Sequence, residues 1–259
     1  MNGTVTVLDK GAVRIHCYMS PADTFHTTTQ LIETPARIIA IDAQLLPAYA
    51  EEIVAYAKGL GKPLDRLIVT HAHPDHYNGA SRFDAPVHAL AQVSEQIIAR
   101  GDSNLPTGQV IPLAEFTPNV TLVPGTEVID GVPFVFEAVS GGEAADELLI
   151  KLPEQRVLIA QDLVYNDVHL YLGNNDITGW QQAVDALASE SGYDTILAGH
   201  GLPTGPEVYE DVRRYLDDAR KLLGDDGDAY KKAIVDKYPA HVGPFIIDIA
   251  NRSLFPAAG

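Results

Sequence analysis

The sequence contains a single cysteine, Cys17, so no disulfide can form within the chain. Chains without internal disulfides are typical of a reducing compartment. The first ten residues carry polar side chains and lack the apolar stretch of a secretory signal peptide. These two features favour a cytoplasmic protein.

Long hydrophobic runs and an excess of positive charge are missing as well. No segment approaches the roughly 18 consecutive apolar residues of a membrane-spanning helix, so no contact with a membrane is expected. The chain has 18 lysines and arginines against 35 aspartates and glutamates, a formal net charge of −17. Nucleic acid binding requires a basic surface, so the charge argues against this class of function.

Short β-rich stretches alternate with helical stretches along the chain, without a repeat or a linker. Strands are predicted at 13–18, 27–32, 37–41, 66–70, 120–123, 133–138, 148–152, 156–160 and 195–198. Helices are predicted at 46–58, 178–189, 206–224 and 228–238. This pattern predicts a single layered α/β domain over residues 1–259, with a helical C-terminal extension from about residue 206. Trp180 and the apolar stretch 245–249 are interpreted as core or interface packing, which makes the C-terminal segment a candidate surface for a homodimer.

The segment His71-Ala72-His73-Pro74-Asp75-His76 directly follows an apolar stretch at 67–69. Side chains two residues apart in an extended chain point to the same side, so His71 and His73 can bind one metal ion together. Asp75 and His76 follow where the chain turns into a helix, and they point toward a neighbouring position. Three histidines and an aspartate this close together pack poorly, and they are typical of a metal site.

The pattern His71-x-His73-x-Asp75-His76 at a strand end resembles the signature of the metallo-β-lactamase superfamily, and the resemblance runs from about residue 25 to residue 201. It implies a four-layer αββα sandwich with metal ions at one edge of its two sheets. Asp162, just past the apolar stretch 157–160, stands where the family's metal-bridging carboxylate is expected. His200 follows the apolar stretch 196–198 and stands where a further histidine ligand is expected.

One ligand position departs from the common family pattern. Most members have Gly-His in the loop before the strand that carries the bridging aspartate, whereas this chain has Gly142-Glu143. The residues Glu143 and Glu147 are similar to the corresponding loop of the alkylsulfatase branch, which also uses a glutamate. Glu143 is therefore predicted as the third ligand of the first metal ion, with Asp146 or Glu147 as alternatives.

These assignments describe two metal sites that share one carboxylate. His71, His73, Glu143 and Asp162 would bind one divalent ion, and Asp75, His76, His200 and Asp162 would bind the other. Zinc is expected, with manganese or iron as alternatives because three carboxylate ligands suit harder ions. A hydroxide held between the metals would attack the substrate, and Asp75 is the candidate catalytic residue that orients this hydroxide or passes on its proton.

The expected function is the hydrolysis of an ester, lactone, sulfate or related bond in a small molecule. The alternative is an iron-dependent redox enzyme of the same fold, acting on oxygen or sulfur compounds. His26, Tyr165 and His169 are candidate substrate-binding residues. The stretch 165–172 faintly resembles the alkylsulfatase branch, but the arginine that follows there is missing after Leu172.

Overall fold

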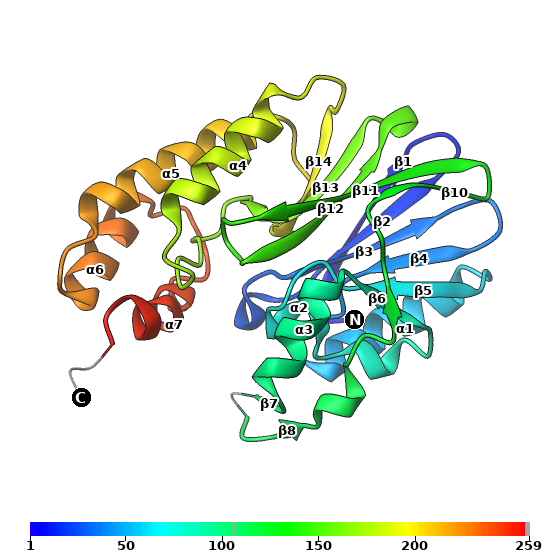
Figure 1. Cartoon of the computed structure of the whole chain (residues 1–259), viewed down its shortest axis with the longest axis horizontal. Helices are drawn as coiled ribbons and strands as arrows, with labels where there is room; N and C mark the ends of the chain where they lie inside the picture. Colours follow the sequence, from blue (N-terminus) through cyan, green and yellow to red (C-terminus); the bar gives the residue numbers. More distant parts are fainter. Residues whose placement is uncertain (106, 257–259) are drawn as a thin grey trace.

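The computed structural model describes residues 1–105 and 107–256, and two β-sheets packed face to face form its centre (Figure 1). The first sheet has seven strands in the order β1-β2-β3-β4-β5-β6-β9. They are β1 (Thr4–Asp9), β2 (Arg14–Met19), β3 (Thr28–Glu33), β4 (Ile38–Ile41), β5 (Leu64–Ile68), β6 (Val87–Ala89) and β9 (Val120–Thr121). Neighbours are antiparallel from β1 to β4 and parallel from β4 to β9.

The second sheet has five strands in the order β10-β11-β12-β13-β14. They are β10 (Gly125–Ile129), β11 (Val132–Ser140), β12 (Asp146–Leu152), β13 (Val157–Tyr165) and β14 (Thr195–His200). Only β13 and β14 run parallel. A small separate ribbon pairs β7 (Ser103–Asn104) with β8 (Val110–Ile111).

Helices cover the outer faces of both sheets. The first sheet is covered by α1 (Pro47–Gly59), the single turn α2 (Pro74–Tyr77) and α3 (Ala91–Arg100) (Figure 1). The second sheet is covered by α4 (Ile177–Ser189) and α5 (Val208–Leu222), which are followed by α6 (Gly227–Lys237) and α7 (Phe245–Leu254). Short 3₁₀ turns are η1 (Ala22–Thr24), η2 (Ala80–Arg82), η3 (Leu113–Glu115) and η4 (Pro153–Gln155). None of the described helices has the length and apolar character needed to cross a membrane.

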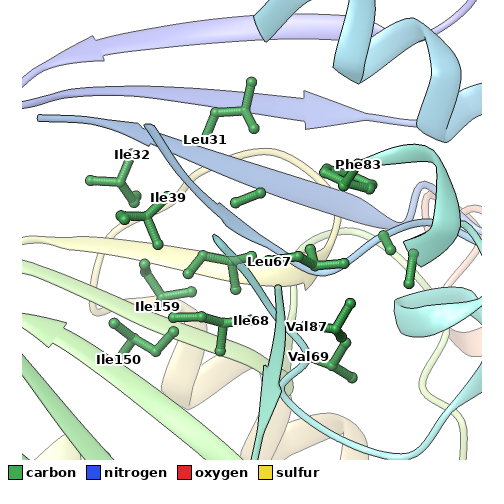
Figure 2. Packing of buried hydrophobic residues seen from close by; sticks show 14 of the residues in the cluster. Leu31, Ile32, Ile39, Leu67, Ile68, Val69, Phe83, Val87, Ile150 and Ile159 are labelled. Carbon is green, nitrogen blue, oxygen red and sulfur yellow. The ribbon is translucent and has the colours of Figure 1, made fainter. Parts of the chain in front are cut away.

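Strand alternation explains why the layers form. Successive side chains of a strand point to opposite faces, and nearly all side chains of β12 are buried on both faces because both are covered. Ile150 packs in the core between the sheets, whereas Leu149 belongs to the core under the C-terminal helices. Figure 2 shows Ile150 and Ile159 of the second sheet opposite Ile32 and Ile39 of the first. The four-layer αββα fold predicted from the sequence is confirmed.

The topology brings the predicted ligands to one edge of the sandwich. The parallel strands β4 and β5 end together at that edge, and the segment that starts at His71 follows β5. In the second sheet, the parallel strands β13 and β14 carry Asp162 and His200 near their carboxyl ends, while Glu143 lies in the turn between β11 and β12. A backbone bridge between His71 and Glu147 joins the two sheets there.

Candidate metal centre

All seven predicted ligands lie in two adjoining groups at this edge. One group consists of His71, His73, Glu143 and Asp162, and the other of Asp75, His76 and His200; within each group the ligand atoms lie within 4.8 Å of one another. Asp75 and His200, which are 125 positions apart (200 − 75), thus meet in one group.

The first group is compact around the carboxylate of Glu143. Its Oε2 atom lies 3.0 Å from Nδ1 of His73 and 3.8 Å from Nε2 of His71. The Oδ2 atom of Asp162 lies 3.6 Å from the same His71 nitrogen. Two nitrogens and two carboxylate oxygens therefore surround a single position, which is a donor set that fits a divalent ion such as zinc.

The second group is arranged around the carboxylate of Asp75. Its Oδ2 atom lies 3.4 Å from Nε2 of His76 and 3.5 Å from Nε2 of His200. Asp162 contacts this group too, with Oδ1 at 3.3 Å from His76 and Oδ2 at 3.1 Å from His200. Asp162 therefore stands between the two groups, where a carboxylate can bind two ions at once.

Buried atoms without a hydrogen-bond partner test whether a metal fits. Within the described residues, Nε2 of His71, Nε2 of His76, Oε2 of Glu143 and Oδ1 of Asp162 are fully buried and unpaired. Leaving such atoms unpaired costs free energy, so folded proteins pair nearly all of them. These four unpaired atoms belong to the two groups of potential metal ligands, and bound cations would satisfy all of them.

Hydrogen bonds from the opposite side of each ring orient three of the histidines. Nδ1 of His76 lies 2.8 Å from Oδ2 of Asp42, and Nδ1 of His200 lies 2.9 Å from the carbonyl oxygen of Phe25. Nδ1 of His71 lies 3.0 Å from the Thr70 hydroxyl. With Nδ1 as the donor, each ring presents the lone pair of Nε2 to the centre, as metal-binding histidines do.

Asp42 is a functional residue that the sequence reading missed. It directly follows β4 with a φ of 61°, and its side chain is completely buried. Oδ1 accepts a hydrogen bond from the backbone N–H of Thr70 at 2.8 Å, and Oδ2 accepts one from the Thr70 hydroxyl at 2.8 Å. The side-chain amide of Gln161 also donates to Oδ2. One carboxylate thus fixes the start of the motif, His76 and the strand segment beside Asp162.

The structure distinguishes the three candidates for the unusual ligand. Asp146 is directed elsewhere, because its oxygens accept from Ser140 and Gln96. Glu147 is buried next to the centre, but its Oε1 accepts from the backbone N–H of Ala144 at 3.1 Å. Glu143 is the one of the three that belongs to a ligand group, so the geometry favours Glu143.

The electrostatics of the first group suit its two histidines to metal binding at neutral pH. Burial lowers the pKa of His71 well below its usual value and that of His73 to about 4, so both rings are neutral and their lone pairs are available. Burial and the nearby carboxylates of Asp162 and Asp75 raise the pKa of Glu143 well above its usual value. Cations at the centre would reverse this last effect and keep the carboxylate ionised. In the second group burial opposes protonation, but the carboxylates of Asp162 and Asp75 raise the pKa of His76 and His200, so a cation there would replace protons.

The three predicted substrate-binding residues have different surroundings. The hydroxyl of Tyr165 lies 2.9 Å from Oδ2 of Asp162 and 3.3 Å from Oε1 of Glu143, so it holds ligand carboxylates while its ring lines the cavity described below. His169 is buried with Nδ1 at 2.9 Å from the Tyr215 hydroxyl, and the carbonyl of His26 accepts from the N–H of Gly201. Neither histidine is among the described residues that line the cavity.

A cavity of about 530 Å³ opens over the metal centre. Its floor includes His73, Asp75, Glu143, Asp162 and His200. The walls are apolar in large part and also carry two arginines: they include Phe25, Leu45, Leu105, Ile246, Ile249, Arg100 and Arg252. A volume of this size accommodates a small organic molecule.

Comparisons with known proteins agree with this fold. The model of the metallo-beta-lactamase superfamily matches residues 39–200. Among solved structures, the metallo-beta-lactamase from Pontibacter korlensis has a TM-score of 0.66 at 21% identity, covering 83% of this chain and 100% of that chain. The FIM-1 metallo-beta-lactamase from Pseudomonas aeruginosa, in a mono-zinc form, has a TM-score of 0.65 at 21% identity, covering 85% of this chain and 96% of that chain. At such identities the likeness is one of fold.

Two curated relatives are sulfatases. The alkyl/aryl-sulfatase BDS1 of Saccharomyces cerevisiae is 29% identical over 222 residues, covering 67% of this chain and 34% of that protein. The linear primary-alkylsulfatase of a Pseudomonas species is 24% identical over 243 residues, covering 75% of this chain and 45% of that protein. This chain thus spans less than half the length of either relative.

Proposed function

Because this chain belongs to the metallo-beta-lactamase superfamily, we propose that it is a hydrolase whose active site holds two divalent metal ions. The observation that carries the proposal is the convergence of buried, unpaired ligand atoms in two groups that share Asp162. When bound, two divalent ions would activate a water molecule and polarise the scissile bond. Zinc is the proposed metal, because the ligands are nitrogen and oxygen atoms of the kinds that zinc binds.

The residues of the chain have distinct roles in this proposal. Asp75 lines the cavity and contacts both His76 and His200, which places it to orient a water molecule and accept its proton. Its Oδ2 atom, which faces both histidines, also accepts a hydrogen bond from the Thr27 hydroxyl at 3.1 Å. Tyr165 keeps the carboxylates of Asp162 and Glu143 in place.

For the substrate, we propose a small organic ester, with sulfate esters as the first class to test. Two observations support this choice: the curated relatives are sulfatases, and the cavity combines an apolar wall with arginines. Carboxylic esters and lactones would be hydrolysed by the same attack of activated water on a polarised carbon, so they belong in the same test.

The test is a panel of chromogenic substrates offered to the protein before and after zinc loading. The panel contains 4-nitrophenyl sulfate, phosphate and butyrate, with a lactone followed by pH indicator. We expect zinc-dependent turnover of at least one member, abolished in Asp162→Ala. Absence of turnover for every member in protein that carries two zinc ions would contradict the proposal.

The assignment of Glu143 has its own test with a matched control. Glu143→Gln removes the charge of the proposed ligand, whereas Glu147→Gln changes a neighbouring carboxylate that does not belong to this group of potential ligands. We expect Glu143→Gln to lose affinity for one of the two metal ions, and Glu147→Gln to keep both. The reverse result would assign the ligand to Glu147.

A further inference from the structure

Part of the cavity wall contains no metal ligand. It is built by two segments that lie outside the His71–His76 motif. Arg100 is the last residue of α3, and Leu105 follows β7 shortly after it. On the other side, Ile249 and Arg252 lie in α7. Both arginines line the cavity together with the ligands of the metal centre.

These arginines stand out because almost every other cation of the chain is engaged. Within the described residues, Lys58, Arg100 and Arg252 are the lysines and arginines that form neither an ion pair nor a hydrogen bond with another side chain. The chain has 35 acidic residues to offer as partners. Two of the three unengaged cations nevertheless line the cavity over the metal centre, where they can receive an anion.

Contacts of α7 with the rest of the protein set where the exposed side chain of Arg252 leaves the backbone. Phe245 at the start of α7 stacks on Phe25 with ring centroids 4.4 Å apart, and the carbonyl of Phe25 is the acceptor for Nδ1 of His200. Asp248 of α7 forms an ion pair with Lys231 at 2.6 Å. The helix that presents Arg252 is thus attached to the same loop that orients a metal ligand.

We propose that Arg100 and Arg252 form an anion-binding pair that selects substrates bearing a carboxylate or sulfate-type oxyanion on an apolar chain. This inference rests on the proposed function, and it assigns specificity-determining residues to the same cavity. Guanidinium groups bind planar and tetrahedral oxyanions through paired N–H donors. Leu105, Ile246 and Ile249 offer apolar surface next to the arginines for the rest of the molecule. A local positive pair is needed here because a net charge of −17 repels anions from the protein as a whole.

Binding can be measured without turnover, using probes that the enzyme cannot hydrolyse. Decanoate, decane-1-sulfonate and neutral decanol are titrated into zinc-loaded protein by calorimetry. Each arginine would donate charge-assisted hydrogen bonds to the oxyanion, which are stronger than hydrogen bonds between neutral groups. Arg100→Gln and Arg252→Gln are therefore each expected to weaken binding of the anionic probes roughly tenfold or more. Decanol binding should change little.

Lys58→Gln is the matched control, because it removes an unengaged cation that does not line the cavity. It should bind all probes like the wild type. A loss for one anionic probe alone would support the pair and identify the preferred oxyanion. Equal affinities of wild type and the double arginine variant for both anions would overturn the proposal, as would an equal loss for decanol.

The outcome is separable from that of the substrate panel. If the protein hydrolyses panel substrates but binds anions equally well without the two arginines, the anion-binding pair alone is refuted. Arginine-dependent binding by a protein that hydrolyses nothing would refute the proposed function alone. Melting curves of each variant establish that the fold is intact.

Discussion

The substitution Asp42→Asn separates the support of the metal centre from its ligands. All four contacts of the Asp42 carboxylate are with donors, from the N–H and hydroxyl of Thr70, from His76 and from Gln161. An asparagine has the same shape and tolerates the φ of 61° at this position. Its amide nitrogen, however, must face at least one donor, and Oδ2 alone receives three of the four contacts.

The size of the effect follows from what His76 loses. The amide oxygen of an asparagine can still accept from Nδ1–H of His76, but without the carboxylate charge it favours this tautomer less strongly, and the other tautomer directs a proton at the metal position. Mutation of such a partner of a ligating histidine typically weakens metal binding about 10–100-fold. A buried donor left unpaired also lowers the free energy of unfolding by about 1–3 kcal/mol.

Competition with a chromophoric chelator measures the affinity of each metal ion in the variant. We expect the weaker binding to concern the ion held by Asp75, His76 and His200, while the ion held by His71, His73 and Glu143 is affected less. Melting curves recorded with excess EDTA report the metal-free stability separately. Unchanged affinities for both ions in a folded Asp42→Asn protein would refute this reasoning.

Three further substitutions test other parts of the account. Tyr165→Phe removes the hydroxyl near Asp162 and Glu143, and chelator competition should show roughly tenfold weaker metal binding; an unchanged affinity would show that the hydroxyl is dispensable. A Cβ at Gly199 would overlap Oδ1 of Asp162, so Gly199→Ala should lose bound metal. Gly224→Ala, whose Cβ meets nothing within 4 Å, should keep it. Full metal content in Gly199→Ala would contradict the structure around Asp162. Burial alone would raise the pKa of Glu33. Hydrogen bonds from Arg14, Lys62 and His16 outweigh burial and lower this pKa from 4.5 to about 2. Because this pKa is lower in the folded state, the ionised carboxylate stabilises the fold above pH 4.5, and this stability is lost as the pH falls toward 2. In urea unfolding, Glu33→Gln should therefore lower the free energy of unfolding by about 3 kcal/mol at pH 7 and by less at pH 3. An equal loss at both pH values would disprove the ion-pair explanation.

Much of the fold could be predicted from periodicity, and the omissions have physical reasons. The strands that became β3, β4, β11 and β12 are apolar or alternate, and the predicted ranges overlap the observed ones. β1 was missed although Thr4-Val5-Thr6-Val7 alternates polar and apolar residues as an edge strand does. α7 was interpreted only as apolar packing, since Gly243 and Pro244 precede a run of isoleucines without a capping side chain.

The candidate site was predictable where its chemistry is local in sequence. His71, His73, Asp75 and His76 fall within six residues, and Asp162 and His200 each follow an apolar stretch of sequence. Asp42 was not predictable in this way, because a lone aspartate after a strand gives no sign of its contacts. Arg252 shows the same limit, since its place in the cavity depends on how α7 docks against Phe25.

The central claim is a pair of metal ions joined by Asp162, and the metal content of the reconstituted protein tests it most directly. The protein is stripped with chelator, loaded with excess zinc, desalted and analysed for metal per chain, alongside Asp162→Ala. We expect close to two equivalents of zinc per chain in the wild type and a loss of more than one equivalent in the variant. A wild-type protein that retains a single equivalent after loading, or a variant that retains two, would contradict the central claim.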